Sequence, residues 1–148
     1  MSRKKSLLRN ELIENGHEME VRVYYEDTDF SGVVYHSNYL KFMERSRTEW
    51  LRHLEIFHTD LATDDSAFAI HRMSLKFGPP AVIDDLLIVR TKLQKLTGAR
   101  SYLRQEVLRA ESDGSETLLC GADVEVAFIN HGGGAKRFPD ELRTKLGG

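Results

Sequence analysis

Residues 37–54 form the one long amphipathic stretch of the sequence. Its apolar side chains recur at the spacing of a single helical face: Leu40, Met43, Trp50, Leu51 and Leu54. The pattern predicts a helix that begins at Ser37 or Asn38, since either side chain can serve as an N-cap, and that ends near Leu54. Because no other long helix is predicted, this one has to cover the apolar face of whatever sheet the rest of the chain forms.

Strand-like alternation surrounds the predicted helix. It is clearest over Cys120–Phe128, where every second side chain is apolar. Residues 101–110 contain many helix formers, but the Asp113-Gly114 turn that follows them favours a β-hairpin. The predicted strands cover residues 19–25, 67–77, 86–96, 101–110 and 120–128, and a short helix is predicted over 139–146. One strand, one long helix and four further strands predict an α+β fold with a five-stranded, mainly antiparallel sheet.

The 148 residues fit a single domain over 18–148, preceded by a mobile N-terminal tail over 1–17 that shows little periodicity. The basic segment near the N-terminus contains only two consecutive leucines, too few for a secretory signal. Cys120 is the only cysteine, so no intramolecular disulfide can form, which suits a reducing compartment. We therefore expect a cytoplasmic protein. The net charge of −2 argues against nucleic-acid binding through a global positive field.

The stretch Tyr24–Tyr39 concentrates polar chemistry where a strand gives way to the helix. Asp27 and Asp29 lie two residues apart, and an arbitrary Asp-x-Asp pair most often caps turns. A carboxylate that faces a helix N-terminus can also act as a nucleophile or a general base. The N–H groups near His36 would then stabilise an oxyanion, and the side chains of His36 and Tyr25 would position the substrate.

Other chemistries find little support. The histidines are scattered and make no metal-ligand spacing: His17, His36, His53, His58, His71 and His131. No Gly-x-Ser-x-Gly elbow is present, and Gly132–Gly134 lacks the ending of a phosphate loop. We expect Cys120 to be a buried structural residue and Glu44 to form an exposed ion pair with a neighbouring arginine. No metal and no redox cofactor is therefore expected.

The segment Tyr24–Tyr39, followed by Phe42–Glu49, resembles the hotdog-fold acyl-CoA thioesterases. The resemblance is to the branch associated with the Tol-Pal cell-envelope system, which is related to 4-hydroxybenzoyl-CoA thioesterase. It is sharp over residues 21–54 and continues loosely to about Phe138. It implies a curved antiparallel sheet wrapped around one helix. It also implies dimers joined edge to edge with active sites at the subunit interface, often paired into homotetramers.

The resemblance also assigns roles to single residues. Asp29 takes the position of the family's catalytic carboxylate, Tyr25 and His36 take positions linked to activity, and the amide of His36 takes the place of the oxyanion donor. Phe30 stands where small residues are common. Four further residues fall where related enzymes contact the phosphates of coenzyme A: Arg100, Ser101, Lys136 and Arg137.

These observations predict an enzyme that hydrolyses acyl-CoA to a carboxylic acid and free coenzyme A. Coenzyme A would enter as part of the substrate, and no other cofactor is expected. Two alternatives remain open. One is a non-catalytic module that binds acyl-CoA or an acyl carrier protein, with Tol-Pal-linked envelope proteins as partners. The other is a hotdog hydratase or dehydratase whose product keeps the thioester.

Overall fold

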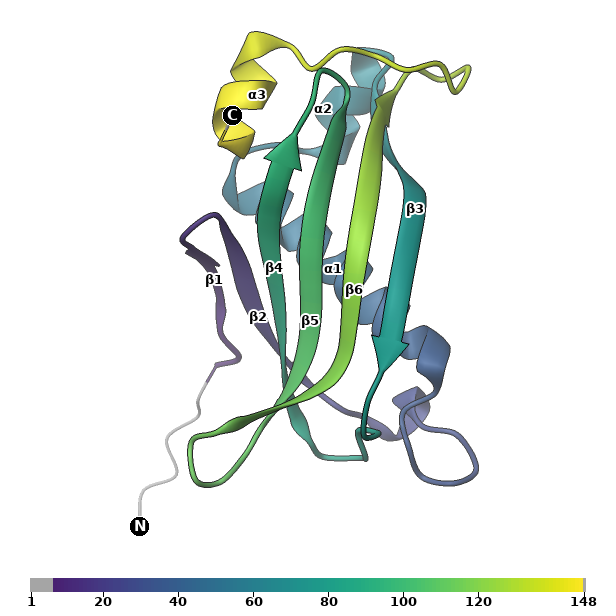
Figure 1. Cartoon of the computed structure of the whole chain (residues 1–148), viewed down its shortest axis with the longest axis vertical. Coiled ribbons are helices and arrows are strands. Elements are labelled where there is room, and N and C mark those ends of the chain that lie inside the picture. The colour runs from purple at the N-terminus through teal and green to yellow at the C-terminus, as the bar shows by residue number, and fades with distance from the viewer. Residues whose placement is uncertain (1–6, 148) are drawn as a thin grey trace.

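The computed structural model of the chain describes residues 7–147, whose strands form one antiparallel sheet in the order β1-β2-β4-β5-β6-β3 (Figure 1). The strands are β1 (Asn10–Ile13), β2 (Gly16–Arg22), β3 (Ala67–Phe77), β4 (Leu86–Leu96), β5 (Arg100–Ala110) and β6 (Glu116–Ile129). The helical segments are the 3₁₀ turn η1 (Tyr25–Asp27) and the helices α1 (His36–His53), α2 (His58–Thr63) and α3 (Asp140–Leu146).

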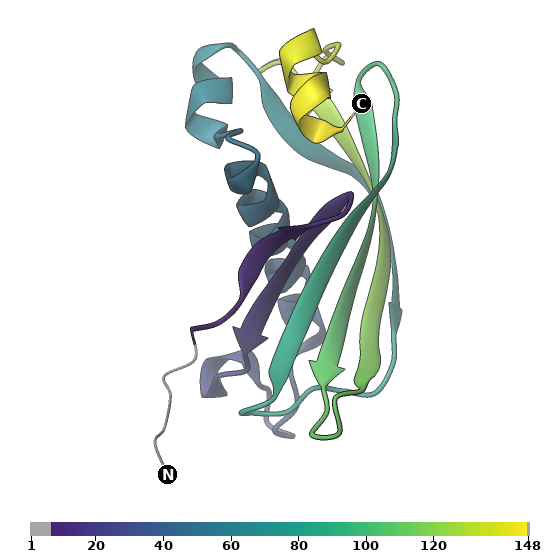
Figure 2. The ribbon, with the colours of Figure 1, turned by 90° about the vertical axis from the view of Figure 1, so that its left-hand side faces the viewer.

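Helix α1 lies along one face of the sheet, and the sheet curves around it (Figure 2). The side chains of Phe42, Met43 and Trp50 are buried between the helix and the strands. The inward-facing positions of the strands complete this core, among them Leu87, Val89, Leu103, Val107, Val124 and Phe128. The predicted α+β fold is therefore confirmed, and the wrapped helix is the arrangement that the hotdog resemblance implies.

The predicted number of five strands is wrong by one, because residues expected in a mobile tail belong to the sheet. Asn10–Ile13 forms β1 and pairs with β2 in an antiparallel register. His17, also placed in the tail by the sequence, is fully buried. The pairing is short and held largely by polar side chains, so it leaves no periodic pattern in the sequence. Residues 1–6, which the same prediction covers, lie outside the described part of the chain.

The junction before α1 also differs in detail from the prediction. The strand expected to reach residue 25 ends at Arg22, and the chain then makes the turn η1. Helix α1 begins at His36, with Tyr35 at the N-cap position and no side-chain cap. The predicted cap Asn38 instead donates a hydrogen bond from Nδ2 to Asp27. The predicted strands over 67–77, 86–96 and 101–110 and the C-terminal helix are confirmed.

The molecule has two distinct ends (Figure 1). The first turn of α1 lies at the same end as the C-terminal end of β3. Helices α2 and α3 and the predicted Thr97–Ala99 turn between β4 and β5 lie at the opposite end. None of the helices within residues 7–147 is long and apolar enough to cross a membrane.

Candidate active site

The loop between η1 and α1 folds back on itself and pairs Asp29 with Val33, three residues before the helix start. The N–H of Asp29 donates to the carbonyl of Val33 at 2.9 Å, and the N–H of Tyr35 donates to the carbonyl of Asp27 at 3.1 Å. A backbone turn closes where the N–H of Gly32 donates to the carbonyl of Asp29 at 3.0 Å. Gly32 has φ of 78°, a left-handed conformation that glycine adopts without strain. Glycine at this position therefore allows the tight return.

Asp27 has the structural role that the sequence analysis favoured for such a pair. Its side chain is buried, Oδ2 accepts from the N–H of Tyr24 at 2.9 Å, and Oδ1 accepts from Nδ2 of Asn38 at 2.8 Å. These two bonds join the turn before the loop to the first turn of α1. Asp27 therefore fixes the loop that carries Asp29.

The carboxylate of Asp29 is exposed and only partly engaged. One oxygen, Oδ1, accepts from the N–H of Ser31 at 2.8 Å. The other oxygen accepts no hydrogen bond from residues 7–147. Asp29 therefore has one carboxylate oxygen that is free to meet a ligand.

The first turn of α1 supplies donors at the same place. The N–H of Asn38 donates to the carbonyl of Tyr35 at 2.8 Å, whereas the N–H groups of His36 and Ser37 have no acceptor in the described chain. Free N–H groups and the helix dipole together favour a negatively charged ligand atom. The His36 ring stacks at 4.4 Å from Tyr35 and meets Phe77, at the end of β3, edge-on at 6.2 Å.

Two aromatic residues of this loop project from the single chain. Tyr25 is 82% exposed, and its hydroxyl makes no hydrogen bond with the described residues. Phe30, at the tip of the turn after Asp29, is fully exposed. Neither ring packs on its own chain, so the structure of one chain gives Tyr25 no contact through which it could position Asp29.

The predicted phosphate contacts lie at the opposite end of the molecule (Figure 1). Arg100 Nη1 pairs with Glu125 at 2.6 Å, and Ser101 is buried. Lys136 Nζ donates at 2.6 Å both to the carbonyl of Asp64 and to the Ser66 hydroxyl. Arg137 is exposed and lies against Gly98 in the β4–β5 turn. A single chain therefore carries Asp29, His36 and the N–H donors on one segment at one end and these four residues at the other end.

A buried polar network under α1 was not predicted. The Ser46 and Thr91 hydroxyls lie 3.0 Å apart, and Gln105 Nε2 donates to Thr91 at 2.9 Å. Arg47 Nη1 donates to Gln105 Oε1 at 2.8 Å. The signal in the sequence was Gln105 itself, which stands at an inward position of β5 where the alternation calls for an apolar side chain.

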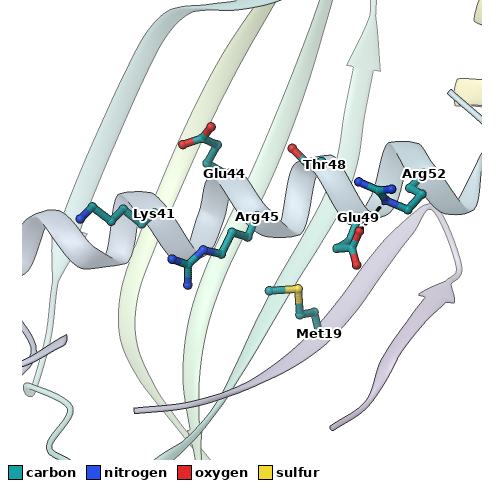
Figure 3. Close-up of a pocket in the computed structure, with 7 residues that line it drawn as sticks. All are labelled: Met19, Lys41, Glu44, Arg45, Thr48, Glu49 and Arg52. Atoms are coloured by element: carbon teal, nitrogen blue, oxygen red, sulfur yellow. Dashed lines mark hydrogen bonds and ion pairs between the residues drawn. The ribbon is translucent and has the colours of Figure 1, made fainter. Parts of the chain in front are cut away.

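An open groove of about 660 Å³ runs along the outer face of α1 (Figure 3). Its floor is Met19 of β2, and Arg45 lies over it. Glu49 pairs with Arg52 at 2.9 Å. Glu44 is exposed, as predicted, but forms no ion pair with any residue of 7–147, so that part of the prediction is wrong. Its carboxylate has no ion-pair partner within the described part of the chain.

The remaining candidate nucleophile is inert. Cys120 is fully buried, and burial raises the pKa of its thiol to about 11. The thiol is therefore neutral near pH 7 and does not reach solvent. Among residues 7–147, no three His, Cys, Asp or Glu side chains gather closely enough to hold a metal ion. Asp29 and the N–H groups at the start of α1 are thus the candidate reactive groups within residues 7–147.

The model of one protein family, the thioesterase-like superfamily, matches residues 23–146. The chain belongs to this superfamily. Among thioesterases of known sequence, the acyl-CoA thioester hydrolase YbgC of Escherichia coli is 40% identical over 110 residues. That match covers 74% of this chain and 79% of the relative.

Solved thioesterase structures share the fold. A probable thioesterase from Bartonella henselae is 41% identical with a TM-score of 0.76, over 84% of this chain and 99% of that one. The 4-hydroxybenzoyl CoA thioesterase from Pseudomonas has a TM-score of 0.78 over 86% of this chain and 96% of that one. At 20% identity the Pseudomonas structure supports the fold alone.

Proposed function

We propose that this protein hydrolyses acyl-CoA thioesters to a carboxylic acid and free coenzyme A. The observation that carries the proposal is that one short segment holds both the exposed Asp29 carboxylate, with one oxygen free within residues 7–147, and the free N–H groups of His36 and Ser37 at the start of α1. Membership of the thioesterase-like superfamily and the similarity to an acyl-CoA thioester hydrolase support it. Neither a metal nor a redox cofactor takes part in the proposed reaction.

The reaction needs a nucleophile at the thioester carbonyl and a site for the charge that develops there. Asp29 either attacks the carbonyl carbon, forming a mixed anhydride that water then cleaves, or removes a proton from the attacking water. The carbonyl oxygen becomes an oxyanion, which the N–H groups of His36 and Ser37 stabilise. The C–S bond then breaks, and the coenzyme A thiolate leaves and takes up a proton. The His36 ring and Tyr25 shape the entrance.

The partner needed to complete the site is a second copy of the chain. β3 is an edge strand, and a free edge exposes backbone groups that can pair with another strand. Two β3 strands paired antiparallel would bring the α2–α3 end of one copy beside the α1 start of the other. Arg100, Ser101, Lys136 and Arg137 of the second copy would then approach Asp29 and could meet the coenzyme A phosphates. We extend the proposal to dimers of this kind, paired into homotetramers.

The proposed substrate and the state of Cys120 both bear on the cellular compartment of the reaction. Acyl-CoA is the proposed substrate, and Cys120 is a lone buried thiol rather than half of a disulfide. We therefore place the reaction in the cytoplasm.

The proposal is tested with purified protein and a panel of short, long and aromatic acyl-CoAs, by following the release of free thiol. We expect turnover of at least one class. In Asp29→Asn we expect kcat to fall by about 10²–10⁴-fold, because the carboxylate is lost while the loop keeps its shape. Near-full activity in Asp29→Asn would show that another group does the chemistry. A product that keeps the thioester would favour a hydratase instead.

A further inference from the structure

Arg47 is a half-buried cation without an anionic partner. Its Nη1 donates to the neutral amide oxygen of Gln105 at 2.8 Å, and burial lowers the pKa of the guanidinium. No carboxylate of residues 7–147 lies within ion-pair distance of it. Removing a charge from water is costly unless an opposite charge compensates it. The Glu44 carboxylate, three residues earlier on the same helix, opposes this fall in the pKa of Arg47 but does not reach ion-pair distance, so within residues 7–147 the charge is only partly compensated.

The amide that holds Arg47 is itself fixed. Gln105 Nε2 donates to the carbonyl of Met43 at 3.0 Å and to the Thr91 hydroxyl at 2.9 Å. Both N–H groups of the amide are therefore used, and its oxygen is left to accept from Arg47. This arrangement positions the guanidinium, while its other nitrogens make no hydrogen bond within the described chain and remain available as donors.

Glu44 is the complementary charge on the same helix. It lies three residues before Arg47, so both side chains leave the same flank of α1. Glu44 is exposed and unpaired within residues 7–147, whereas Glu49 pairs with Arg52 at 2.9 Å. In Figure 3 the Glu44 side chain projects away from Met19 and β2, while Arg45 lies towards them.

Arg47 lies on the side of α1 that faces the free edge of the sheet, and Glu44, which lines the groove above Met19, precedes it by three residues on the helix. Arg47 lines a small hollow together with Phe68 of β3 and Val126 of β6. His36 at the helix start, which contacts Phe77 at the end of β3, lies on the same flank. Arg47 therefore lies on the surface that joins the candidate site to the edge strand β3.

We infer that Glu44 of one copy forms an ion pair with Arg47 of a second copy, and that the same pair forms a second time around a two-fold axis. The inference rests on the proposed dimer and adds the contact that aligns its helices. A two-fold interface places one patch against itself, so a patch with one free anion and one free cation is self-complementary. Helix α1 spans His36–His53, so a point midway between Glu44 and Arg47 lies near its centre. Two antiparallel copies of α1 joined there overlap along most of their length.

A carboxylate from a second copy fits this position better than one from a substrate. The hollow beside Arg47 has a volume of about 20 Å³, which is room for a single water molecule. The Arg47 nitrogens other than Nη1 make no hydrogen bond within residues 7–147, so they can donate to a carboxylate that approaches from outside. A second helix held there would cover this flank of α1 and shield the exposed site from water, which strengthens electrostatic stabilisation of the oxyanion.

Two charge reversals test the pairing. In Glu44→Lys all four charges at the interface become positive, and in Arg47→Glu all four become negative. We expect each variant alone to raise the dissociation constant of the dimer by about 10²-fold or more. An equimolar mixture of the two variants should restore the dimer, because each mixed pair again joins one cation to one anion. Sedimentation equilibrium measures this without reference to activity, so it is independent of whether the chain is a thioesterase.

Arg45→Glu is the matched control, since it makes the same charge change two residues away on the flank that faces β2. It should dimerise like the unaltered protein. Circular dichroism of each variant establishes that it is folded, and Glu44→Gln and Arg47→Gln give milder versions that should weaken the dimer by a smaller factor. The inference is overturned if the single reversals dimerise normally or if the mixture stays monomeric. It is also overturned if Arg47→Glu stays dimeric and loses turnover only with acyl-CoAs that carry a distal carboxylate.

Discussion

At the scale of single residues, two aspartates separated by one residue take opposite roles. Asp27 is buried and accepts hydrogen bonds from the Tyr24 N–H and the Asn38 side chain. The Asp29 carboxylate is exposed and accepts only from the Ser31 N–H in the described chain. One carboxylate builds the loop and the other is left for chemistry, which is why a variant at each position should fail in a different way.

We expect Asp27→Ala to lower the free energy of unfolding by about 2–3 kcal/mol, because each lost hydrogen bond to a charged group contributes about 1.5–3 kcal/mol and partial relaxation offsets part of the loss. Asp29→Ala should lower it by less than about 1 kcal/mol. Urea titration of both variants measures the difference. Equal stability losses in the two would contradict the structural role assigned to Asp27.

At the scale of elements, the β1–β2 hairpin docks on the end of α1 through polar contacts. Asn10 Nδ2 donates to Glu49 Oε1 at 2.9 Å, so its Oδ1 accepts from His17 Nε2 at 2.5 Å. His17 Nδ1 is then unprotonated, and it is buried without a hydrogen-bond partner. Burial, with a smaller contribution from His53, lowers the pKa of His17 to about 4 from its ordinary 6.5.

This shift predicts the pH dependence of stability. His17 is neutral when folded but becomes protonated in the unfolded chain below about pH 6.5, so acid favours unfolding. The stabilisation is complete above pH 6.5 and is lost as the pH falls towards 4, at about 1.4 kcal/mol per pH unit. Urea titrations from pH 7 to 4 should show this slope, and His17→Leu should remove it. A matching loss of slope in His58→Leu, an exposed histidine on α2, would contradict the assignment.

The β1–β2 hairpin is a part of the fold that could not be predicted from the sequence. Strands β4 and β6 and helix α1 were predicted because their side chains alternate or recur at a fixed period, which directly reflects one buried face. Strand β5 was predicted from the Asp113-Gly114 turn that follows it. β1 is four residues long and docks through Asn10, so its side chains show no hydrophobic periodicity from which the strand could be predicted. The Arg47–Gln105 bond was also missed, because the polar Gln105 at an inward position of β5 does not indicate which residue, 58 positions away, it contacts.

At the scale of the whole molecule, Asp29 and the N–H donors were predictable because they lie within one short loop. The single chain keeps Arg100 and Arg137 at its other end, so their part in the proposed site depends on the proposed pairing of two copies. The single chain leaves the carboxylate, Tyr25 and Phe30 in solvent. A site this open cannot exclude water from the developing oxyanion, so catalysis should require the second copy.

We therefore expect the specific activity to fall on dilution, as dimers separate into monomers with incomplete sites. The midpoint of this fall should coincide with the dimer dissociation constant from sedimentation at the same pH and salt concentration. Activity should return on reconcentration, which separates dissociation from irreversible unfolding. In Arg47→Gln the midpoint should move to higher protein concentration while the activity of the saturated dimer changes little, since Arg47 touches no reacting atom. Full specific activity in a sample shown to be monomeric would refute the requirement for a second copy.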